Sequence, residues 1–358
     1  MLEEFIRSEL ERLRGDRLVR EPRVIQRVRG PFVVVDGREL LSFCSNDYLG
    51  LAQDPRLAQA AAKAAADFGW GAGSARTMSG TTRWHAELEE AIAGFKGLPA
   101  ALFFPSGYMA NLALVTALAD RDTTILSDEL NHASLIDACR LSRARVEVYP
   151  HGDAAAAGRL ARSAGGRAFI LTDTVFSMDG DLAPLDALRK LGLDVVVDDV
   201  HGLGVFGPEG RGALDVAIQS GNLAKAAGSV GGFIAGSHDL VELVRSRGRS
   251  FLFTTAPPAA VCAAGIEALA LVRAAHDRRA RLWENIRLLG ARSPIHTVVL
   301  GSNERALAAS RALFEKGFFV PAIRPPTVPA GTARLRVTVT ALHEREHVEA
   351  LVQALREV

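Results

Sequence analysis

The sequence predicts an α/β protein with a mainly parallel, doubly wound sheet in a large domain, followed by a smaller C-terminal α+β domain and preceded by an N-terminal arm. Between about residues 55 and 235, short apolar runs of strand length alternate with helical stretches. Such alternation is typical of βαβ units, which form parallel sheets. The expected strands of this sheet are Ala101–Phe104, Thr124–Leu126, Val146–Tyr149, Phe169–Thr172, Val195–Val197 and Gly232–Ala235.

The two ends of the chain have different patterns. Residues 1 to about 18 predict an amphipathic helix, and two short strands follow near Phe32–Val35 and Leu40–Phe43. From about 256 to 290 the pattern is helical and rich in alanine. Strand patterns then occur around residues 296–300, 317–321 and 334–339, before a last helix after His343. We therefore expect an arm over residues 1–50, a large domain over 51–255 and a small domain over 256–358.

Composition favours a metabolic enzyme. The 358 residues carry a net charge of +1, which gives no electrostatic reason to expect nucleic acid or membrane partners. Cys44, Cys139 and Cys262 are widely spaced and include no CxxC pair, so a reducing cytoplasm is expected rather than a disulfide framework. The N-terminus is charged and amphipathic, unlike a signal peptide.

Lys225 is a single cation among alanines and glycines, just before an apolar strand. Burial lowers the pKa of a lysine and yields the neutral amine that forms a Schiff base with an aldehyde. A surface lysine whose stem lies along apolar atoms is the alternative. The sequence upstream favours the first interpretation.

Acidic side chains and a histidine follow the apolar run Val195–Val197, namely Asp198, Asp199 and His201. This run is typical of a strand buried on both faces, and open α/β sheets bind ligands at the carboxyl ends of such strands. An aspartate near a Schiff-base lysine is what pyridoxal 5'-phosphate (PLP) chemistry requires, because the anion keeps the pyridine nitrogen protonated. Asp198 is the candidate.

Two other motifs suggest different chemistry and are rejected from their context. Residues 202–207 fit GxGxxG, but a proline and two glycines follow where a dinucleotide-binding helix would continue, and acids precede the motif. His343-Glu-Arg-Glu-His fits HExxH, but no third metal ligand is evident and the segment is rich in charges of both signs. We expect no metal site.

Eight ordered motifs resemble the α-oxoamine synthase family of fold-type I PLP-dependent enzymes, and the resemblance extends over nearly the whole chain. They are Phe43-Cys-Ser-Asn-Asp-Tyr-Leu-Gly, Ser79-Gly-Thr, Pro105-Ser-Gly-Tyr-Met-Ala-Asn, Asn131-His-Ala-Ser-Leu-Ile-Asp, Val175-Phe-Ser-Met-Asp-Gly-Asp, Asp198–His201, Lys225, and the segment from Ile323 to Arg336.

The resemblance implies a cofactor, an activity and an assembly. The cofactor is PLP. The segment from Ile323 to Arg336 most resembles members that condense L-alanine with a pimeloyl thioester, with loss of CO2, in biotin biosynthesis. Coenzyme A and a carrier protein are both possible acyl carriers. A homodimer with shared active sites is implied. A glycine-using sibling such as 2-amino-3-ketobutyrate ligase, an aminotransferase and a non-catalytic PLP-binding relative are the alternatives.

The resemblance also assigns cofactor roles residue by residue. Lys225 would hold PLP as a Schiff base and then act as general base and acid. Asp198 would pair with the pyridinium nitrogen and His201 would reach the phenolic oxygen. His132 would stack on the ring and so face the substrate, although the same residue could simply cap a helix. The remaining cofactor contacts would come from Gly107, Tyr108, Ser177, Asn222, Thr254 and Thr255, the last two acting on the partner subunit's phosphate.

Four residues are assigned to the substrates. Arg336 and Asn46 would hold the carboxylate of the amino acid, a group that the planar guanidinium binds with two parallel hydrogen bonds. Arg324 and Thr327 would contact the acyl substrate. The prolines at 325 and 326 could equally make this segment a rigid structural turn.

The chain departs from the family pattern near the lysine. Asn222 stands where the family usually has threonine, and residues 212–221 lack the usual apolar strand. Asp173 stands where the family usually has glutamate. The change at Asn222 leaves open which group contacts the phosphate. Asp173 keeps the carboxylate, on a side chain one methylene shorter than that of glutamate.

Overall fold

The computed structural model describes residues 1–358, which form two compact units. One unit comprises residues 1–46, 178–180 and 280–358, and the other comprises residues 47–177 and 181–279. We call them the terminal unit and the sheet unit. This division differs from the predicted boundaries in two places. The arm lies in the same unit as the C-terminal residues, and the second boundary falls near residue 280 rather than 255. The physical reason is that the apolar helix α10 (Ala259–Ala274) packs on α2 (Pro55–Phe68) and α3 (Arg83–Lys96).

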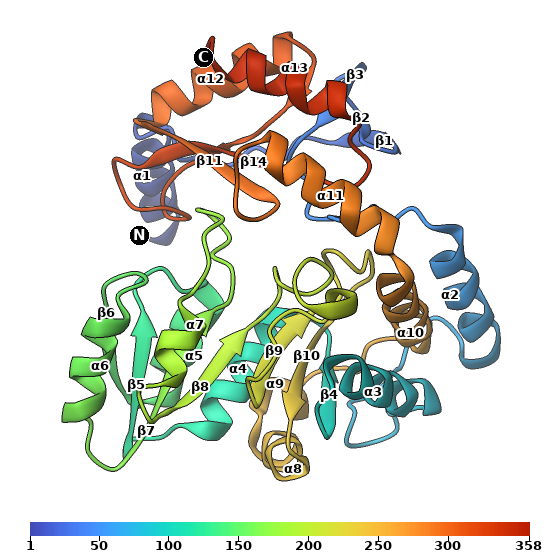
Figure 1. Ribbon diagram of the computed structural model, residues 1–358, viewed down its shortest axis with the longest axis vertical. Helices are drawn as coiled ribbons and strands as arrows, with labels where there is room; N and C mark the ends of the chain where they lie inside the picture. The colour runs from blue at the N-terminus through green and yellow to red at the C-terminus, as the bar shows by residue number, and fades with distance from the viewer. The chain divides into compact units, whose positions relative to one another are not determined.

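A seven-stranded sheet forms the centre of the sheet unit, in the order β4-β10-β9-β8-β7-β5-β6 (Figure 1). Its parallel core is β9, β8, β7, β5 and β6, and β10 is antiparallel to both of its neighbours. The strands are β4 (Ala100–Phe104), β5 (Thr123–Asp128), β6 (Arg145–Tyr149), β7 (Arg167–Asp173), β8 (Asp194–Asp198), β9 (Ile218–Asn222) and β10 (Gly232–Gly236). All six expected strands are present, and the prediction of a mainly parallel sheet is confirmed.

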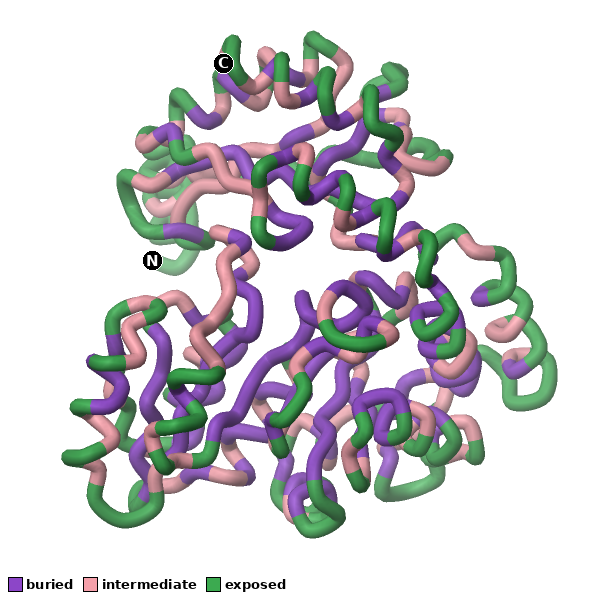
Figure 2. Tube along the Cα trace, in the orientation of Figure 1, coloured by how far each residue is buried: buried purple, intermediate pink, exposed green.

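Helices cover both faces of this sheet, because successive side chains of a strand point to opposite sides. Val196 of β8 belongs to the buried cluster that includes side chains of helices α4, α5, α8 and α9, whereas Val195 and Val197 belong to the cluster that includes side chains of α6 and α7. Figure 2 shows the strands between these helices as mostly buried. The helices are α4 (Gly107–Leu118), α5 (Ala133–Ser142), α6 (Ala154–Ser163), α7 (Leu185–Arg189), α8 (His238–Arg247) and α9 (Arg249–Leu252), with a 3-10 turn η1 at Pro208–Gly210.

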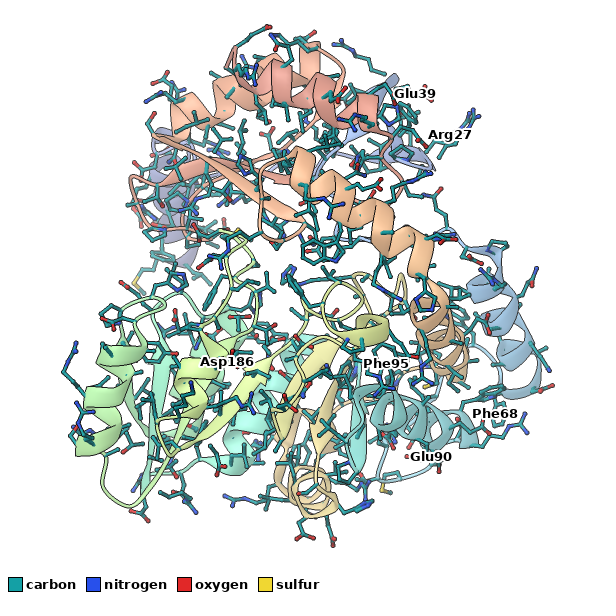
Figure 3. All side chains as sticks on the ribbon, in the orientation of Figure 1. Arg27, Glu39, Phe68, Glu90, Phe95 and Asp186 are labelled. Carbon is teal, nitrogen blue, oxygen red and sulfur yellow. The ribbon has the colours of Figure 1, made fainter.

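Polar side chains at helix ends set where the helices begin. Asp54 accepts a hydrogen bond from the N–H of Arg56 at the start of α2, and Ser106 accepts one from Met109 at the start of α4. In α3, Phe95 is buried in the unit while Glu90 lies on the exposed face (Figure 3). The amphipathic pattern of the sequence therefore decides which face of each helix packs.

The terminal unit contains two smaller sheets, of order β1-β2-β3-β12 and β11-β14-β13. The N-terminal strands pair with β12 from the C-terminal part, which is why the arm belongs to this unit. Its elements are α1 (Leu2–Gly15), β1 (Ile25–Arg29), β2 (Phe32–Val35), β3 (Arg38–Ser42), β11 (Ile295–Gly301), α12 (Asn303–Glu315), β12 (Phe318–Phe319), β13 (Ala322–Ile323), β14 (Ala333–Thr338) and α13 (Arg345–Leu355), and α11 (His276–Leu288) spans the boundary.

The structure resolves the two rejected motifs and the question of a membrane span. Residues 202–207 form turns rather than a helix start, and buried His343 accepts the N–H of Thr340 and pairs through Nε2 with the carbonyl of Ser42. Burial lowers the pKa of His343 to about 4. No one helix has both the length and the apolar character needed to cross a bilayer; only α10 and α11 together, bent by 69°, meet the test.

Candidate functional site

Lys225 follows β9 and lies beside His201 of the loop after β8. The Nζ of Lys225 is 2.6 Å from Nε2 of His201. The backbone turns directly after the lysine, where the N–H of Gly228 donates to the carbonyl of Lys225. Gly228 has φ +64°, and a Cβ there would come within 2.3 Å of the backbone of Ala52, so only glycine fits. This turn fixes where the lysine leaves the strand.

His201 has a second partner that the sequence reasoning missed. Its Nδ1 lies 2.5 Å from the hydroxyl oxygen of Tyr48, and both side chains are almost fully buried. Tyr48 belongs to one of the motifs that carry the family resemblance, so a signal was present. The partnership joins residues 153 positions apart, which no local pattern reveals.

Asp198 ends β8 as a buried carboxylate with two hydrogen-bond donors. Its Oδ2 accepts from Nδ2 of Asn111 at 2.7 Å, and its Oδ1 accepts from the N–H of Val200 at 3.1 Å. Asn111 lies in α4, and its own oxygen accepts from the hydroxyl of Ser220 in β9. The carboxylate is thus held in one orientation by groups from a neighbouring helix and its own loop.

A chain of hydrogen bonds continues from Asn111 to His132. The same Nδ2 of Asn111 donates to Oγ of Ser134, and that oxygen is 2.7 Å from Nδ1 of His132. The backbone N–H of His132 donates to Oδ2 of Asp173 at 2.7 Å. The structure therefore brings the predicted residues Asp198, His132 and Asp173 together.

This network changes the pKa values of two of its members. Burial raises the pKa of Asp173 well above its ordinary value, and the nearby charge of Asp198 raises it further. Desolvation lowers the pKa of His132, with the Asp198 carboxylate acting in the opposite direction. His132 is nevertheless an exposed residue that caps α5. Its ring is therefore available on one side to a ligand.

The start of α4 meets the end of β9. A Cβ at Gly107 would lie 3.2 Å from Nδ2 of Asn222, and a Cβ at Gly232 would lie 2.4 Å from the Gly107 nitrogen. The glycines thus allow close approach of these segments at the N-terminus of α4, where helix N–H groups suit an anion. Tyr108, also predicted here, is partly exposed and donates its hydroxyl to Asp137.

Residues 212–221 were expected to lack the usual apolar strand, and the strand found there, β9 (Ile218–Asn222) between β8 and β10, is largely polar. This strand is central although its side chains are polar. Nε2 of Gln219 donates to the carbonyls of Ala213 and Val216, and Ser220 donates to Asn111. Internal partners replace the apolar packing that the sequence analysis required.

The other predicted residues of the sheet unit lie on loops. Ser177 is half-buried in the turn that follows β7. Thr254 and Thr255 follow α9, and Thr255 forms an isolated β-bridge with Ala75.

Arg336 and Asn46, both in the terminal unit, lie together as predicted. Arg336 is buried in β14, and its Nη2 donates to Oδ1 of Asn46 at 3.1 Å. Its Nη1 donates to the hydroxyl of Thr338. These bonds hold the plane of the guanidinium.

Arg324 and Thr327 lie close to each other in a turn of the terminal unit. The N–H of Thr327 donates to the carbonyl of Arg324, and the peptide between Pro325 and Pro326 is cis. Nη1 of Arg324 donates to the carbonyl of Arg17, so part of its guanidinium holds the N-terminal segment. Burial lowers the pKa of Arg324. Thr327 is exposed.

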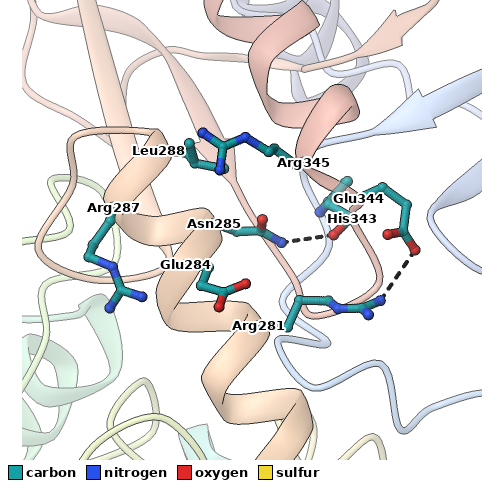
Figure 4. Close-up of a pocket in the computed structure, with 8 residues that line it drawn as sticks. All are labelled: Arg281, Glu284, Asn285, Arg287, Leu288, His343, Glu344 and Arg345. Carbon is teal, nitrogen blue, oxygen red and sulfur yellow. Dashed lines mark hydrogen bonds and ion pairs between the residues drawn. The ribbon is translucent and has the colours of Figure 1, made fainter.

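A cavity of about 480 Å³ in the terminal unit contains none of the predicted residues (Figure 4). Several of its polar lining residues form hydrogen bonds or ion pairs with other residues of the protein. Asn285 donates to the carbonyls of Thr340 and His343, and Arg281 pairs with Glu344. The remaining lining residues are Glu284, Arg287, Leu288 and Arg345.

The sheet unit has the groups that PLP requires. Lys225 offers an amine for the aldehyde, and Asp198 offers a fixed carboxylate for the ring nitrogen. The N-terminus of α4 at Gly107 offers backbone N–H donors for the phosphate. The residues present therefore fit this cofactor.

Comparison with known proteins agrees with this chemistry. The family model for aminotransferase class I and II matches residues 38–355. The 8-amino-7-oxononanoate synthase of Azoarcus sp. is 46% identical over 98% of this chain and 96% of that protein. The enzyme of the same name from Geobacter sulfurreducens is 45% identical over 99% of this chain and 97% of that protein. The chain belongs to the 8-amino-7-oxononanoate synthase family.

Solved structures of this fold support the membership. A serine palmitoyltransferase with a PLP internal aldimine has a TM-score of 0.93 and 30% identity, covering 100% of this chain and 98% of that one. The 8-amino-7-oxononanoate synthase from Francisella tularensis has a TM-score of 0.79 and 28% identity, covering 89% and 97%. The chain is thus a PLP-dependent acyltransferase with the fold-type I architecture.

Proposed function

We propose that this chain condenses L-alanine with a pimeloyl thioester, releasing CO2 and the free thiol, and forms 8-amino-7-oxononanoate for biotin biosynthesis. One observation carries the proposal. In a chain that matches the synthases over almost its full length, Asp198 is the last residue of β8 and Lys225 follows the neighbouring strand β9. An amine and a carboxylate in this arrangement suit decarboxylative carbon–carbon bond formation on an amino acid.

Lys225 is the central catalytic residue of the proposal. When bound, PLP supplies an electron sink that stabilises negative charge at the α carbon of the amino acid. Lys225 holds the cofactor between turnovers. Once alanine has displaced it, Nζ takes the α proton and later returns a proton to the product. The turn closed by Gly228 fixes the backbone from which the Lys225 side chain extends.

Asp198 holds a proton at the ring nitrogen of the cofactor. Its two hydrogen bonds, from Asn111 and Val200, orient the carboxylate before the ligand arrives, so little reorganisation is needed during the reaction. His132 covers a ring face with its exposed imidazole. His201, whose Nε2 lies beside Nζ of Lys225, would contact the phenolic oxygen of the cofactor.

The phosphate is held by the backbone N–H groups of Gly107 and Tyr108 and by Nδ2 of Asn222. The support is the close approach of that amide to Gly107 at the helix start. An amide N–H can donate a hydrogen bond as the family's threonine hydroxyl does. Ser177 contributes from the loop after β7.

Two pairs in the terminal unit handle the substrates. Arg336 and Asn46 bind the carboxylate of alanine, and the bond between them pre-orients the guanidinium. Arg324 and Thr327 contact the pimeloyl chain. Because Arg324 also holds the carbonyl of Arg17, Thr327 is the more available of the two.

We also propose a homodimer in which Thr254 and Thr255 serve the phosphate of the partner subunit. Large apolar side chains are exposed close to these threonines: Phe253 is 72% exposed and Met78 is 80% exposed. The bridge between Ala75 and Thr255 brings their two segments together. Surfaces of this kind mark protein contacts. Phe253→Glu should shift the sedimentation of the dimer toward the monomer. The cytoplasmic location expected from the cysteine pattern stays a prediction.

The identity of the product tests the reaction. Alanine with pimeloyl-CoA should give a product whose mass is that of 8-amino-7-oxononanoate, and with glycine or acetyl-CoA the yield should be much lower. A preference for glycine with a short thioester would replace the proposal by the glycine-using sibling activity. Release of a keto acid from alanine alone would indicate an aminotransferase.

Borohydride reduction tests the role of Lys225. Reduction should attach the cofactor to the Lys225 peptide, and Lys225→Ala should abolish both this attachment and turnover. Lys63→Ala, which alters an exposed lysine, is the matched control and should behave as the parent protein. Attachment to any other lysine would contradict the assignment.

A further inference from the structure

Three polar groups lie in a row beside the proposed cofactor site. The hydroxyl of Tyr48 is 2.5 Å from Nδ1 of His201, and Nε2 of the same ring is 2.6 Å from Nζ of Lys225. They come from three separate segments of the sheet unit: the turn before α2, the loop after β8 and the turn after β9. Tyr48 is fully buried and His201 is 2% exposed. Lys225 is half-buried.

The two contacts of the ring link its tautomer to the protonation of Lys225. A phenol hydroxyl can donate its proton to a nitrogen lone pair, and that of Tyr48 lies within hydrogen-bond distance of Nδ1. Nδ1 then acts as the acceptor, and the single proton of the neutral ring is on Nε2. This N–H points to Nζ of Lys225, and only an unprotonated amine has the lone pair to accept it.

We propose that Tyr48 is a positioning residue that fixes His201 in the Nε2–H tautomer and so keeps Lys225 as a neutral amine ready to attach the cofactor. The inference rests on the proposed function, in which Lys225 carries PLP. Attachment needs the lone pair of Nζ to form a bond to the aldehyde carbon. The two protons of the amine then leave with the carbonyl oxygen as water, and a C=N bond remains. An ammonium group cannot begin this step.

The first test uses the unmodified full-length chain. Solid-state ¹⁵N NMR of histidine-labelled protein stripped of cofactor should show His201 protonated on Nε2 and not on Nδ1, with its signals assigned by their loss in His201→Asn. Protonation on Nδ1 would overturn the proposal without any Tyr48 variant.

The second test is Tyr48→Phe, which removes only the hydroxyl oxygen. PLP added to this variant should attach about three- to tenfold more slowly, as expected for the loss of one hydrogen bond, and the Nδ1–H tautomer should appear in the spectrum. Tyr149→Phe is the matched control, because it removes the hydroxyl of an equally buried ring elsewhere in the sheet unit. It should attach PLP at the parent rate.

The outcomes separate this inference from the proposed function. If PLP fails to attach to Lys225 even in the parent chain, the proposed function is wrong. If the parent attaches PLP normally and Tyr48→Phe matches it in rate and tautomer, only the positioning role is wrong. An equal slowing in Tyr149→Phe would mean that the rate follows loss of buried packing rather than the tautomer.

Discussion

The Nζ of Lys96 lies 2.7 Å from Oδ2 of Asp199, and the two side chains are 0% and 1% exposed. Nζ also donates to the carbonyl of Arg211, while the carboxylate accepts from the hydroxyl of Thr174 and the N–H of Ala213. The ion pair therefore ties helix α3 to both ends of the loop that carries His201. The pair supports the loop that holds His201 in place, and the sequence analysis did not predict it.

Lys96→Met should lower the free energy of unfolding by about 3 to 5 kcal/mol, because it leaves an unpaired carboxylate in the interior. Denaturant unfolding measures this change. Adding Asp199→Asn should restore much of the loss, since a neutral amide keeps the shape without a buried charge. Lys316→Met breaks the exposed pair with Glu357 and is the control, expected to change little. Equal losses in the two lysine variants would contradict the role of burial.

Two glycines of the loop after β8, Gly202 and Gly212, are required by the packing around Asp199. A Cβ at Gly202 would lie 2.0 Å from Oδ1 of Asp199, and a Cβ at Gly212 would lie 1.8 Å from Oδ2. The backbone wraps the buried carboxylate so closely that no side chain fits at either position. Gly202 is also the first glycine of the misleading GxGxxG match at residues 202–207.

Asp198→Asn should slow the exchange of the α proton of alanine by roughly 100-fold, while the affinity for PLP changes much less. The amide keeps the shape and its bond partners Asn111 and Val200 nearby, but it loses the charge that matters most as charge develops on the substrate. Proton exchange followed by NMR in deuterated water is the measurement. Asp186→Asn, at an exposed position, is the control. Unchanged exchange in Asp198→Asn would rule out the role.

His151 predicts a pH dependence of stability. It lies between two carboxylates, with Nδ1 2.8 Å from Asp128 and Nε2 2.7 Å from Asp181, and these bonds raise its pKa from 6.5 to about 10. A pKa raised by folding means that the stabilisation is complete below about pH 6.5 and is lost as the pH rises toward 10. His151→Gln should therefore lower Tm most near pH 6 and least near pH 10.

Thermal unfolding at pH 6, 8 and 10 measures this trend. His238→Gln, which alters an exposed histidine at the start of α8, is the control and should show no such trend. A Tm difference for His151→Gln that stays constant between pH 6 and 10 would mean that the imidazolium is not the stabilising form.

The sequence predicted those parts of the fold that rest on apolar periodicity. Runs such as Val195–Val197 contain only apolar side chains, and they form buried strands. Strand β9 was missed because Gln219 and Ser220 are buried through hydrogen bonds to distant groups, which a hydrophobic pattern cannot show. The boundary near residue 280 was missed for a related reason: α10 is apolar, but the pattern does not say which neighbours it packs against.

The residues of the site also divide into those that the sequence could predict and those that it could not. Lys225 and Asp198 could be predicted because each is an ionisable residue next to an apolar strand. Asn111 and Tyr48 could not, since a neutral polar residue gains its role only from the partner that folding brings to it. The Asn111–Asp198 bond joins residues 87 positions apart, and the Tyr48–His201 contact joins residues 153 positions apart. No local sequence pattern reveals either of them.

Arg336 and Thr327 should give different kinetic defects, because their proposed substrates enter at different steps. Arg336→Ala should reduce both alanine proton exchange and product formation, by an amount equivalent to about 2 to 5 kcal/mol, since it removes the charged partner of the alanine carboxylate. Arg336→Lys should recover only part of this, because an ammonium lacks the planar fork that Asn46 and Thr338 hold in place. Thr327→Ala, at an exposed turn, should leave exchange intact and raise KM for the pimeloyl thioester. Steady-state kinetics and proton exchange on the same preparations distinguish the two. Loss of exchange in Thr327→Ala would place this turn at the amino acid site, and normal exchange in Arg336→Ala would remove the arginine from it.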